Sequence, residues 1–170
     1  VRRAHNLFEV IEQMPEAYRS LLEDFSGVEF QYVSAAPAEL FMRRAHLRFL
    51  RQFDFPVGGV HNRSLAVQAS RVSSKYQFKL RILSNIIRAS NAGQVILIGD
   101  DAEDDSRVFD RIQNRFPEKT IFKFIRMTES PKAKPISLGT FHFLNGFDFY
   151  QTAQTVLRFS CVSERQETEW

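Results

Sequence analysis

The sequence predicts one α/β domain built around a mostly parallel sheet, spanning 1–162 and followed by a flexible tail at 163–170. Two observations lead to this fold class. Segments with helical and strand-like patterns alternate along the 170 residues, which is the order that parallel sheets with crossover helices require. The run at 95–98 is continuously apolar, as expected of a strand that is buried on both faces.

The first half of the chain should contain two helices and two strands. Apolar residues recur at helical spacing over 4–23, although a proline in this segment should break or restart the helix. A strand is expected at 28–33, directly after this helix. Pro37 suits the first turn of a second helix, 37–53, and the segment 55–60 forms a short second strand.

The second half should continue the alternation of helices and strands, because turn-forming residues separate its apolar segments. We expect helices at 77–89, 106–116 and 148–159, and strands at 95–98, 120–126 and 141–144.

Several carboxylates follow the apolar run at 95–98. Gly99 should let the backbone turn, and after it come Asp100, Asp101, Glu103, Asp104 and Asp105. The carboxyl ends of parallel strands are where open α/β sheets bind their ligands. A divalent cation relieves the repulsion among crowded carboxylates, and oxygen-only ligands favour Mg²⁺ over zinc. The alternative is a solvated acidic loop that caps the next helix.

Two other polar residues occupy informative positions. Ser34 directly follows the expected strand at 28–33, so its hydroxyl should lie at the same sheet edge, beside helix N–H groups that suit phosphate. A helix-capping serine is the alternative. Lys79 lies near the start of the helix at 77–89, where a positive charge is slightly unfavourable because of the helix dipole. A solvated lysine tolerates this position, and a lysine that faces an anion is also expected there. Lys75 is the rival candidate.

Composition excludes some classes of protein. Cys161 is the single cysteine, which excludes a disulfide framework and a cysteine metal site and favours a reducing, cytoplasmic setting. The net charge of +3 gives no reason to expect nucleic acid as a partner. No apolar run is long enough to span a bilayer, and the first residues do not resemble a signal peptide.

The order of serine, lysine and acidic loop resembles that of the haloacid-dehalogenase-like hydrolases. Within that superfamily the chain is similar to the phosphatidate phosphatase catalytic-domain family over about 20–150. The matching features are Tyr-Val-Ser-Ala-Ala-Pro at 32–37, Phe55-Pro56, Lys79-Leu80, Leu97-Ile98-Gly99-Asp100, Asp105, Phe116-Pro117 and Phe124-Ile125-Arg126. The resemblance implies a three-layer sandwich and a Mg²⁺-dependent phosphatase that acts through an aspartyl-phosphate.

The resemblance also implies residue roles. Asp100 would be a Mg²⁺ ligand, and Asp105 the second acid of the loop, with Asp104 as its alternative. Asp101 would be either a further Mg²⁺ ligand or a hydrogen-bond acceptor that contacts the ligands without binding the metal. Ser34 would hydrogen-bond a phosphoryl oxygen, and Lys79 would neutralise the transferring phosphate.

Three further residues are candidates for contact with the substrate. Ala35 follows Ser34 in the serine motif. His61, together with Arg63, follows the strand at 55–60, from where both could reach a substrate, although a lone histidine and arginine in a loop are more often surface residues.

Two departures from the family pattern stand out. The acidic loop reads Asp100-Asp101-Ala102, where the family typically has Asp-Ser-Gly. The first motif, a strand followed by Asp-x-Asp that supplies the nucleophile, is missing before residue 28. In this fold that strand lies between the serine-bearing and acidic-loop strands, and its loss leaves buried backbone groups unpaired. We therefore expect a segment carrying the motif upstream of Val1.

The substrate implied is a phosphorylated small molecule or a lipid head group. The rival function is a non-catalytic phosphate- or partner-binding module that has lost its nucleophile. Arginines on one face of the second helix would suit an anionic membrane surface, although a solvated face is the more common role of such a stripe. They are Arg44, Arg48 and Arg51, with Arg43 adjacent to this face.

Overall fold

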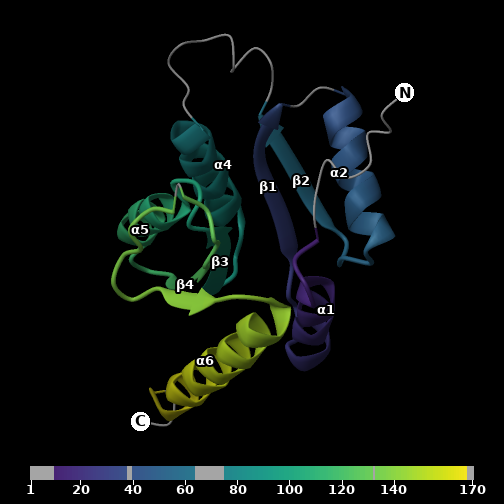
Figure 1. The fold of residues 1–170 in the computed structure, drawn as a ribbon. Helices are drawn as coiled ribbons and strands as arrows, with labels where there is room; N and C mark the ends of the chain where they lie inside the picture. The colour runs from purple at the N-terminus through teal and green to yellow at the C-terminus, as the bar shows by residue number, and fades with distance from the viewer. Residues whose placement is uncertain (1–9, 38–39, 64–74, 132, 168–170) are drawn as a thin grey trace, which may run out of the picture.

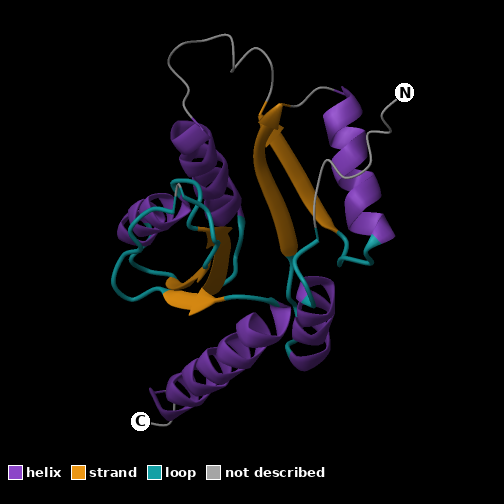
Figure 2. Ribbon diagram, in the orientation of Figure 1, coloured by secondary structure: helices purple, strands orange, loops and turns teal. Residues whose placement is uncertain are grey.

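The computed structural model describes residues 10–37, 40–63, 75–131 and 133–167 (Figure 1). Helices and strands alternate through most of this part of the chain, as Figure 2 shows. The elements are α1 (Met14–Asp24), β1 (Phe30–Pro37), α2 (Leu40–Gln52), β2 (Gly58–Arg63), α4 (Lys75–Ala89), β3 (Gln94–Asp100), α5 (Asp105–Arg115), β4 (Thr120–Arg126), β5 (Phe141–Phe143) and α6 (Gly146–Glu167).

All strand pairs in the described residues are parallel, and they form two sheets. One sheet contains β1 and β2, and the other has the order β3-β4-β5. β1 and β3 are not paired with each other in the part of the chain that the structure describes. Of the two strands in its sheet, β1 lies nearer to β3 (Figure 1). The predicted parallel α/β fold is confirmed, with its strands divided between two sheets.

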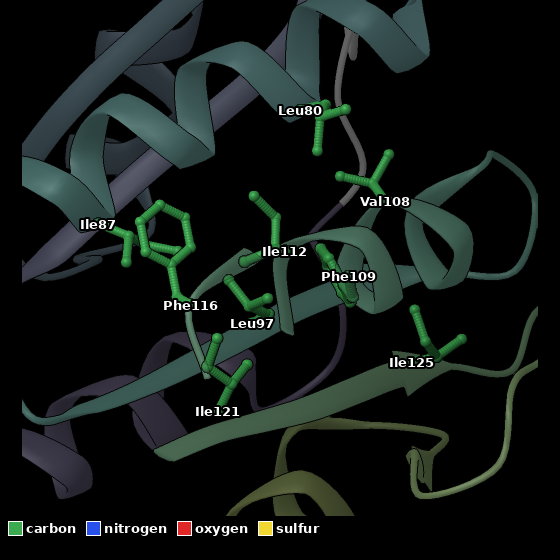
Figure 3. Close-up of a cluster of buried hydrophobic side chains, with 9 residues drawn as sticks. All are labelled: Leu80, Ile87, Leu97, Val108, Phe109, Ile112, Phe116, Ile121 and Ile125. Atoms are coloured by element: carbon green, nitrogen blue, oxygen red, sulfur yellow. The ribbon is translucent and has the colours of Figure 1, made fainter. Parts of the chain in front are cut away.

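Helices cover both faces of the three-stranded sheet. Leu97 and Ile125 on one face pack against α4 and α5 in a buried apolar cluster, which Figure 3 shows in detail. Phe124 and Phe143 on the other face pack against Met14 of α1 and residues of α6. Alternate strand side chains therefore enter opposite cores, as a sheet buried on both faces requires.

The first helix is shorter than its apolar pattern predicts. It begins at Met14, and Pro15 lies in its first turn, where the missing N–H and the fixed φ of proline are favourable. Gln13 has a left-handed backbone with φ of 60°, so the helix does not continue through this residue towards the N-terminus. Residues 4–9 of the segment expected as helix lie outside the described residues.

The prediction that β1 ends before Ser34 is wrong. β1 runs through Pro37, because Ser34 pairs with Asn62 and Pro37 pairs with Arg63 of β2, with an irregularity between the two pairs. Proline is tolerated at the end of a strand that needs no further N–H donor. Pro37 therefore ends β1 and does not start the second helix, and β2 begins at Gly58, later than expected.

Two other boundaries differ from the predictions. α4 begins at Lys75, so Lys79 lies one turn inside the helix and not at its start. α6 continues through Glu167, into the segment expected to be a flexible tail. In the ranges that the structure describes, no helix is long and apolar enough to cross a membrane.

Candidate phosphate-binding site

A cavity of about 350 Å³ opens at the carboxyl end of β1. Ser34 and Ala35, both predicted site residues, line it together with Lys79 from α4. Ser34 lies within β1, and α4, which carries Lys79, packs against this strand. The remaining lining residues are Val33, Arg63, Lys75 and Glu103. The structure therefore brings together the predicted serine, lysine and alanine.

Lys79 is held between two carboxylates. Its side chain is only 13% exposed, and its Nζ donates a hydrogen bond to Asp105 Oδ1 and lies 2.8 Å from Glu103 Oε2. Burial lowers the pKa of Lys79, but the negative charges of Asp105 and Glu103 more than offset this, so its pKa lies above the ordinary value. Lys79 is therefore a fixed positive charge at the cavity.

Asp105 is a buried carboxylate behind Lys79. Its side chain is 8% exposed, and its Oδ2 accepts a hydrogen bond of 3.3 Å from the backbone N–H of Asp100. Burial raises the pKa of Asp105, and the ammonium group of Lys79 opposes that change. A Cβ atom on Gly99 would lie 2.6 Å from the Cβ of Asp105.

The role of Gly99 therefore differs from the one predicted. β3 runs through Gly99 to Asp100, and the backbone of Gly99 does not adopt a left-handed conformation. This glycine leaves space for the side chain of Asp105, and it does not turn the chain.

Glu103 connects two lysines. Its Oε1 lies 2.6 Å from Lys75 Nζ, and its Oε2 lies 2.8 Å from Lys79 Nζ. Burial raises the pKa of Glu103, but the hydrogen bonds and charges of both lysines outweigh burial and lower it to about 2. The sequence places Glu103 in an acidic run without distinguishing it from its neighbours.

The remaining acids of the loop have separate partners. Asp100 Oδ1 accepts a 3.0 Å hydrogen bond from the N–H of Ala102, and Asp104 lies 2.7 Å from Lys134 Nζ. Asp101 is buried and accepts hydrogen bonds from the N–H and the hydroxyl of Thr128. Asp101 therefore anchors the segment that follows β4.

Of the three predicted metal ligands, the structure places Asp100 and Asp105 side by side and pairs Asp104 with a lysine. In the ranges with described placement, no group of three histidine, cysteine or acidic side chains is arranged to hold a metal ion.

His61 and Arg63 occupy different positions on β2. His61 Nε2 lies 2.9 Å from Gln31 Oε1, and His61 does not line the cavity. Arg63 does line it, because it pairs with Pro37 at the far end of β1. Of the two residues expected to reach a substrate from this segment, the structure therefore places Arg63 at the cavity, and the register of β1 and β2 determines which of them lies there.

The charge of the cavity suits an anion. Arg63, Lys75 and Lys79 line it, against one carboxylate, that of Glu103. Lysine and arginine side chains bind phosphate oxygens through charge-assisted hydrogen bonds, and the hydroxyl of Ser34 adds a further polar group. The predicted arginine stripe of α2 is exposed at Arg43, Arg44, Arg48 and Arg51, and its contact with lipid stays a prediction.

Comparison with known proteins identifies the family of this chain. No curated protein and no solved structure matches it. Residues 2–127, well over half of the chain, match the family described as phosphatidate phosphatase APP1, catalytic domain. This range includes the serine, the lysine and the acidic loop described above. The chain therefore belongs to the phosphatidate phosphatase APP1 catalytic-domain family, which indicates that it is a phosphatase.

Proposed function

We propose that this protein is a Mg²⁺-dependent phosphatase that hydrolyses a lipid phosphomonoester of the phosphatidate type. The observation that carries the proposal is the position of Lys79, which is buried against Asp105 at a cavity also lined by Ser34 and Arg63. A cation held in this way is already oriented when a phosphoryl group arrives, so little reorganisation is needed as negative charge develops. Family membership supports the lipid phosphate as substrate class.

The mechanism we propose is that of the haloacid-dehalogenase-like hydrolases. It requires a carboxylate nucleophile on a strand between β1 and β3, and the described residues leave these two strands unpaired with each other. Such a strand would pair with the backbone groups of both edges, and each buried group left unpaired costs about 1–3 kcal/mol. Its carboxyl end would lie beside Ser34 and Asp100, next to the cavity.

Each residue of the cavity has a defined task in this proposal. The Ser34 hydroxyl donates a hydrogen bond to a phosphoryl oxygen. Lys79 and Arg63 balance the negative charge of the transferring group, and the guanidinium group of Arg63 can contact two oxygens at once. Asp105 and Glu103 keep Lys79 in position. Ala35 packs against the cavity as part of its wall.

Asp100 and Asp105 fit a Mg²⁺ site better than the other acids do. Both offer carboxylate oxygens beside the carboxyl end of β3, and the Asp100 N–H lies 3.3 Å from Asp105 Oδ2. Mg²⁺ is usually bound by one or two carboxylates together with substrate phosphate and water. When bound, Mg²⁺ would supply charge stabilisation at a phosphoryl oxygen. Asp104, like Asp105, pairs with a lysine, and we rank it second because the hydrogen bond from the Asp100 N–H goes to Asp105.

The proposal is tested by phosphate release from phosphatidate in mixed micelles, using the full-length protein with and without Mg²⁺. We expect turnover that depends on Mg²⁺. Lys79→Met should lower kcat about a hundredfold, because a cation facing the phosphoryl group is worth about 3 kcal/mol in the transition state. Lys75→Met is the matched control, since it removes the same charge one helical turn earlier, at a side chain that is 61% exposed.

Stability must be measured in parallel, because Lys79→Met leaves the buried Asp105 carboxylate without its cation. The double variant Lys79→Met/Asp105→Asn removes both buried charges, and its stability shows whether an unpaired Asp105 carboxylate is what destabilises Lys79→Met. Only its stability is compared, because Asp105 is also a proposed Mg²⁺ ligand. A folded full-length protein that releases no phosphate from phosphatidate would overturn the proposal. Equal turnover in the Lys79 and Lys75 variants would overturn the role given to Lys79.

A non-catalytic phosphate-binding module is the second candidate function. The observation in its favour is that Glu103, the one carboxylate lining the cavity, is held by two lysines and is therefore a poor nucleophile. In that case the same full-length protein would bind phosphatidate with an affinity that depends on Lys79 and Arg63, without turnover.

A further inference from the structure

A second cavity, of about 150 Å³, lies between α4 and the end of α5. The α4 residues that line it are rotated by about half a turn around the helix axis relative to Lys75 and Lys79, so they lie on the opposite side of α4. Three arginines line this cavity, Arg81 and Arg88 from α4 and Arg115 from α5. We call it the arginine groove.

The arginine groove carries unbalanced positive charge. Its other polar lining residues are Gln77, Ser84 and Asn85, and none of the lining residues is acidic. Among the residues that the structure describes, none of the three arginines forms an ion pair with a carboxylate. Like charges that converge on one small groove repel each other, and an anion bound there would relieve that repulsion.

Arg115 is held in place by a buried serine. Its Nη1 donates a 2.8 Å hydrogen bond to Ser84 Oγ, and Ser84 Oγ donates a 2.7 Å bond to the carbonyl of Leu80. Ser84 is only 2% exposed, which is unusual for a polar residue in the middle of a helix. The Leu80 carbonyl therefore fixes the direction of the Ser84 hydroxyl, and the hydroxyl oxygen in turn orients the guanidinium group of Arg115.

Arg88 is also supported by its neighbours. Its guanidinium group lies 6.0 Å from the centre of the Phe116 ring, and its Nη1 lies 3.4 Å from Asn85 Oδ1. An arginine stacked on an aromatic ring keeps its outer N–H groups available for a ligand. Two of the three arginines therefore have restricted orientations before any ligand binds, which lowers the entropic cost of binding.

We propose that the arginine groove binds the phosphate group of a phosphorylated ligand. Guanidinium groups pair with phosphate or carboxylate through parallel hydrogen bonds. Three arginines that approach from two helices fit a tetrahedral phosphate, which presents acceptors on several sides, better than a planar carboxylate with two oxygens. A volume of about 150 Å³ equals roughly five water molecules, which is enough for one phosphate group.

The site is tested by NMR titration of the protein with inorganic phosphate and with diphosphate, at constant ionic strength. Site-resolved signals separate this groove from the cavity at Lys79, which also favours anions. We expect saturable shifts at the Nε–H groups of Arg81, Arg88 and Arg115. The variant Lys79→Met should keep these shifts, so that failure of the proposed phosphatase site does not affect the result.

Two variants establish whether the groove itself is responsible. Arg81→Gln/Arg88→Gln removes two exposed charges and should weaken phosphate binding at Arg115 at least tenfold. Arg111→Gln is the control, because Arg111 is an exposed arginine of α5, the helix that carries Arg115, and does not line the groove. It should change the affinity less than twofold.

The source of the phosphate is distinguished by flotation with vesicles of phosphatidylcholine, with and without phosphatidate. Recruitment that is lost in Arg81→Gln/Arg88→Gln would identify a lipid head group. Binding of diphosphate without recruitment would identify a freely diffusing ligand. The proposal is overturned if neither probe shifts the three arginines, or if Arg111→Gln weakens binding as much as the double variant.

Discussion

The most consequential contact of single residues is the pair of Lys79 and Asp105. A carboxylate that is 8% exposed is costly to bury unless a cation accompanies it, and Lys79 is itself 13% exposed. Each side chain therefore makes the burial of the other tolerable. Their contact depends on the missing side chain of Gly99, which gives Asp105 its space.

Gly99→Ala should displace Asp105, because the new methyl group would lie 2.5 Å from Asp105 Oδ2 and 2.6 Å from its Cβ. We expect the free energy of unfolding to fall by about 1–3 kcal/mol, as in other overpacked sites. Turnover in the full-length protein should fall as well. Gly93→Ala is the control, since nothing lies within 4 Å of a Cβ there. Equal unfolding midpoints in urea for both variants would contradict this account.

Glu103→Gln should change how stability depends on pH. The pKa of Glu103 is lowered to about 2 in the folded protein, so its ionised form stabilises the fold above about pH 4.5, the ordinary value. That stabilisation is lost as the pH falls from 4.5 towards 2. At pH 7 the variant should be less stable by on the order of 1 kcal/mol, after allowance for solvent screening of a side chain that is 31% exposed.

The measurement for Glu103 is urea unfolding at pH 7 and at pH 3. The difference between wild type and Glu103→Gln should shrink at the lower pH. Glu118→Gln, at an exposed position between α5 and β4, is the control for loss of one negative charge. A difference that stays constant between the two pH values would show that Glu103 is not stabilised by its lysines.

At the scale of helices and strands, the start of α6 lies directly against the residues that lead into α1. The N–H of Gly146 donates a 2.8 Å hydrogen bond to the carbonyl of Glu12. A Cβ on Gly146 would collide with the backbone of Gln13 and Met14. Backbone atoms cannot move aside as a flexible side chain can, so α6 requires glycine at this position.

Gly146→Ala should therefore push α6 away from α1 and lower the free energy of unfolding by about 1–3 kcal/mol. The measurement is the urea midpoint together with the near-ultraviolet circular dichroism of the aromatic cluster around Phe149. Gly93→Ala again serves as the control. A wild-type midpoint for Gly146→Ala would mean that the two helices separate without cost.

The sequence predicted elements well where a local pattern determines them. β4 has the predicted bounds, because β-branched and aromatic residues dominate the segment 120–126. The start of α1 was missed because it depends on the left-handed backbone of Gln13, a feature no periodicity reports. The extent of β1 depends on pairing with β2, which is a property of two segments together.

The same distinction applies to the candidate site. Ser34 and Lys79 are each expected at an end of a secondary-structure element, and the structure places both at one cavity, although β1 continues past Ser34 and α4 begins one turn before Lys79. Arg63 is expected only as a residue that could reach a substrate or lie at the surface, and Glu103 is not distinguished from the other acids. Their positions depend on strand register and on which lysines a flexible carboxylate reaches. His61 was predicted from its position in the chain, whereas its contact is with Gln31.

At the scale of the whole molecule, the division of the strands between two sheets is the main feature. β4 has a paired strand on each side, whereas β1 and β3 are each paired on one side in the part of the chain with described placement. A strand between them would join the two sheets into one. The backbone amides of β1 and β3 that do not bond to β2 or β4 therefore face the gap between the sheets.

Hydrogen exchange followed by NMR should detect this difference. In β1 and β3 of this chain, every second amide forms a hydrogen bond to β2 or β4 and should be protected from exchange. The remaining amides of these two strands should exchange quickly. Amides of β4 should be protected more uniformly. In the full-length protein the fast amides should become protected if a strand fills the gap. Uniform protection of β1 and β3 in this chain would contradict the arrangement.

The packing of α1 against α6 also has a consequence for how the protein is made. Asp24 accepts hydrogen bonds from Tyr150 and Gln154, which lie 126 and 130 residues later in the chain. At about 5–20 residues per second, a ribosome needs roughly 6–26 s to add that length. During this interval the apolar side of α1 has no helix to pack against. The apolar side of α1 therefore stays open to aggregation until α6 has been synthesised.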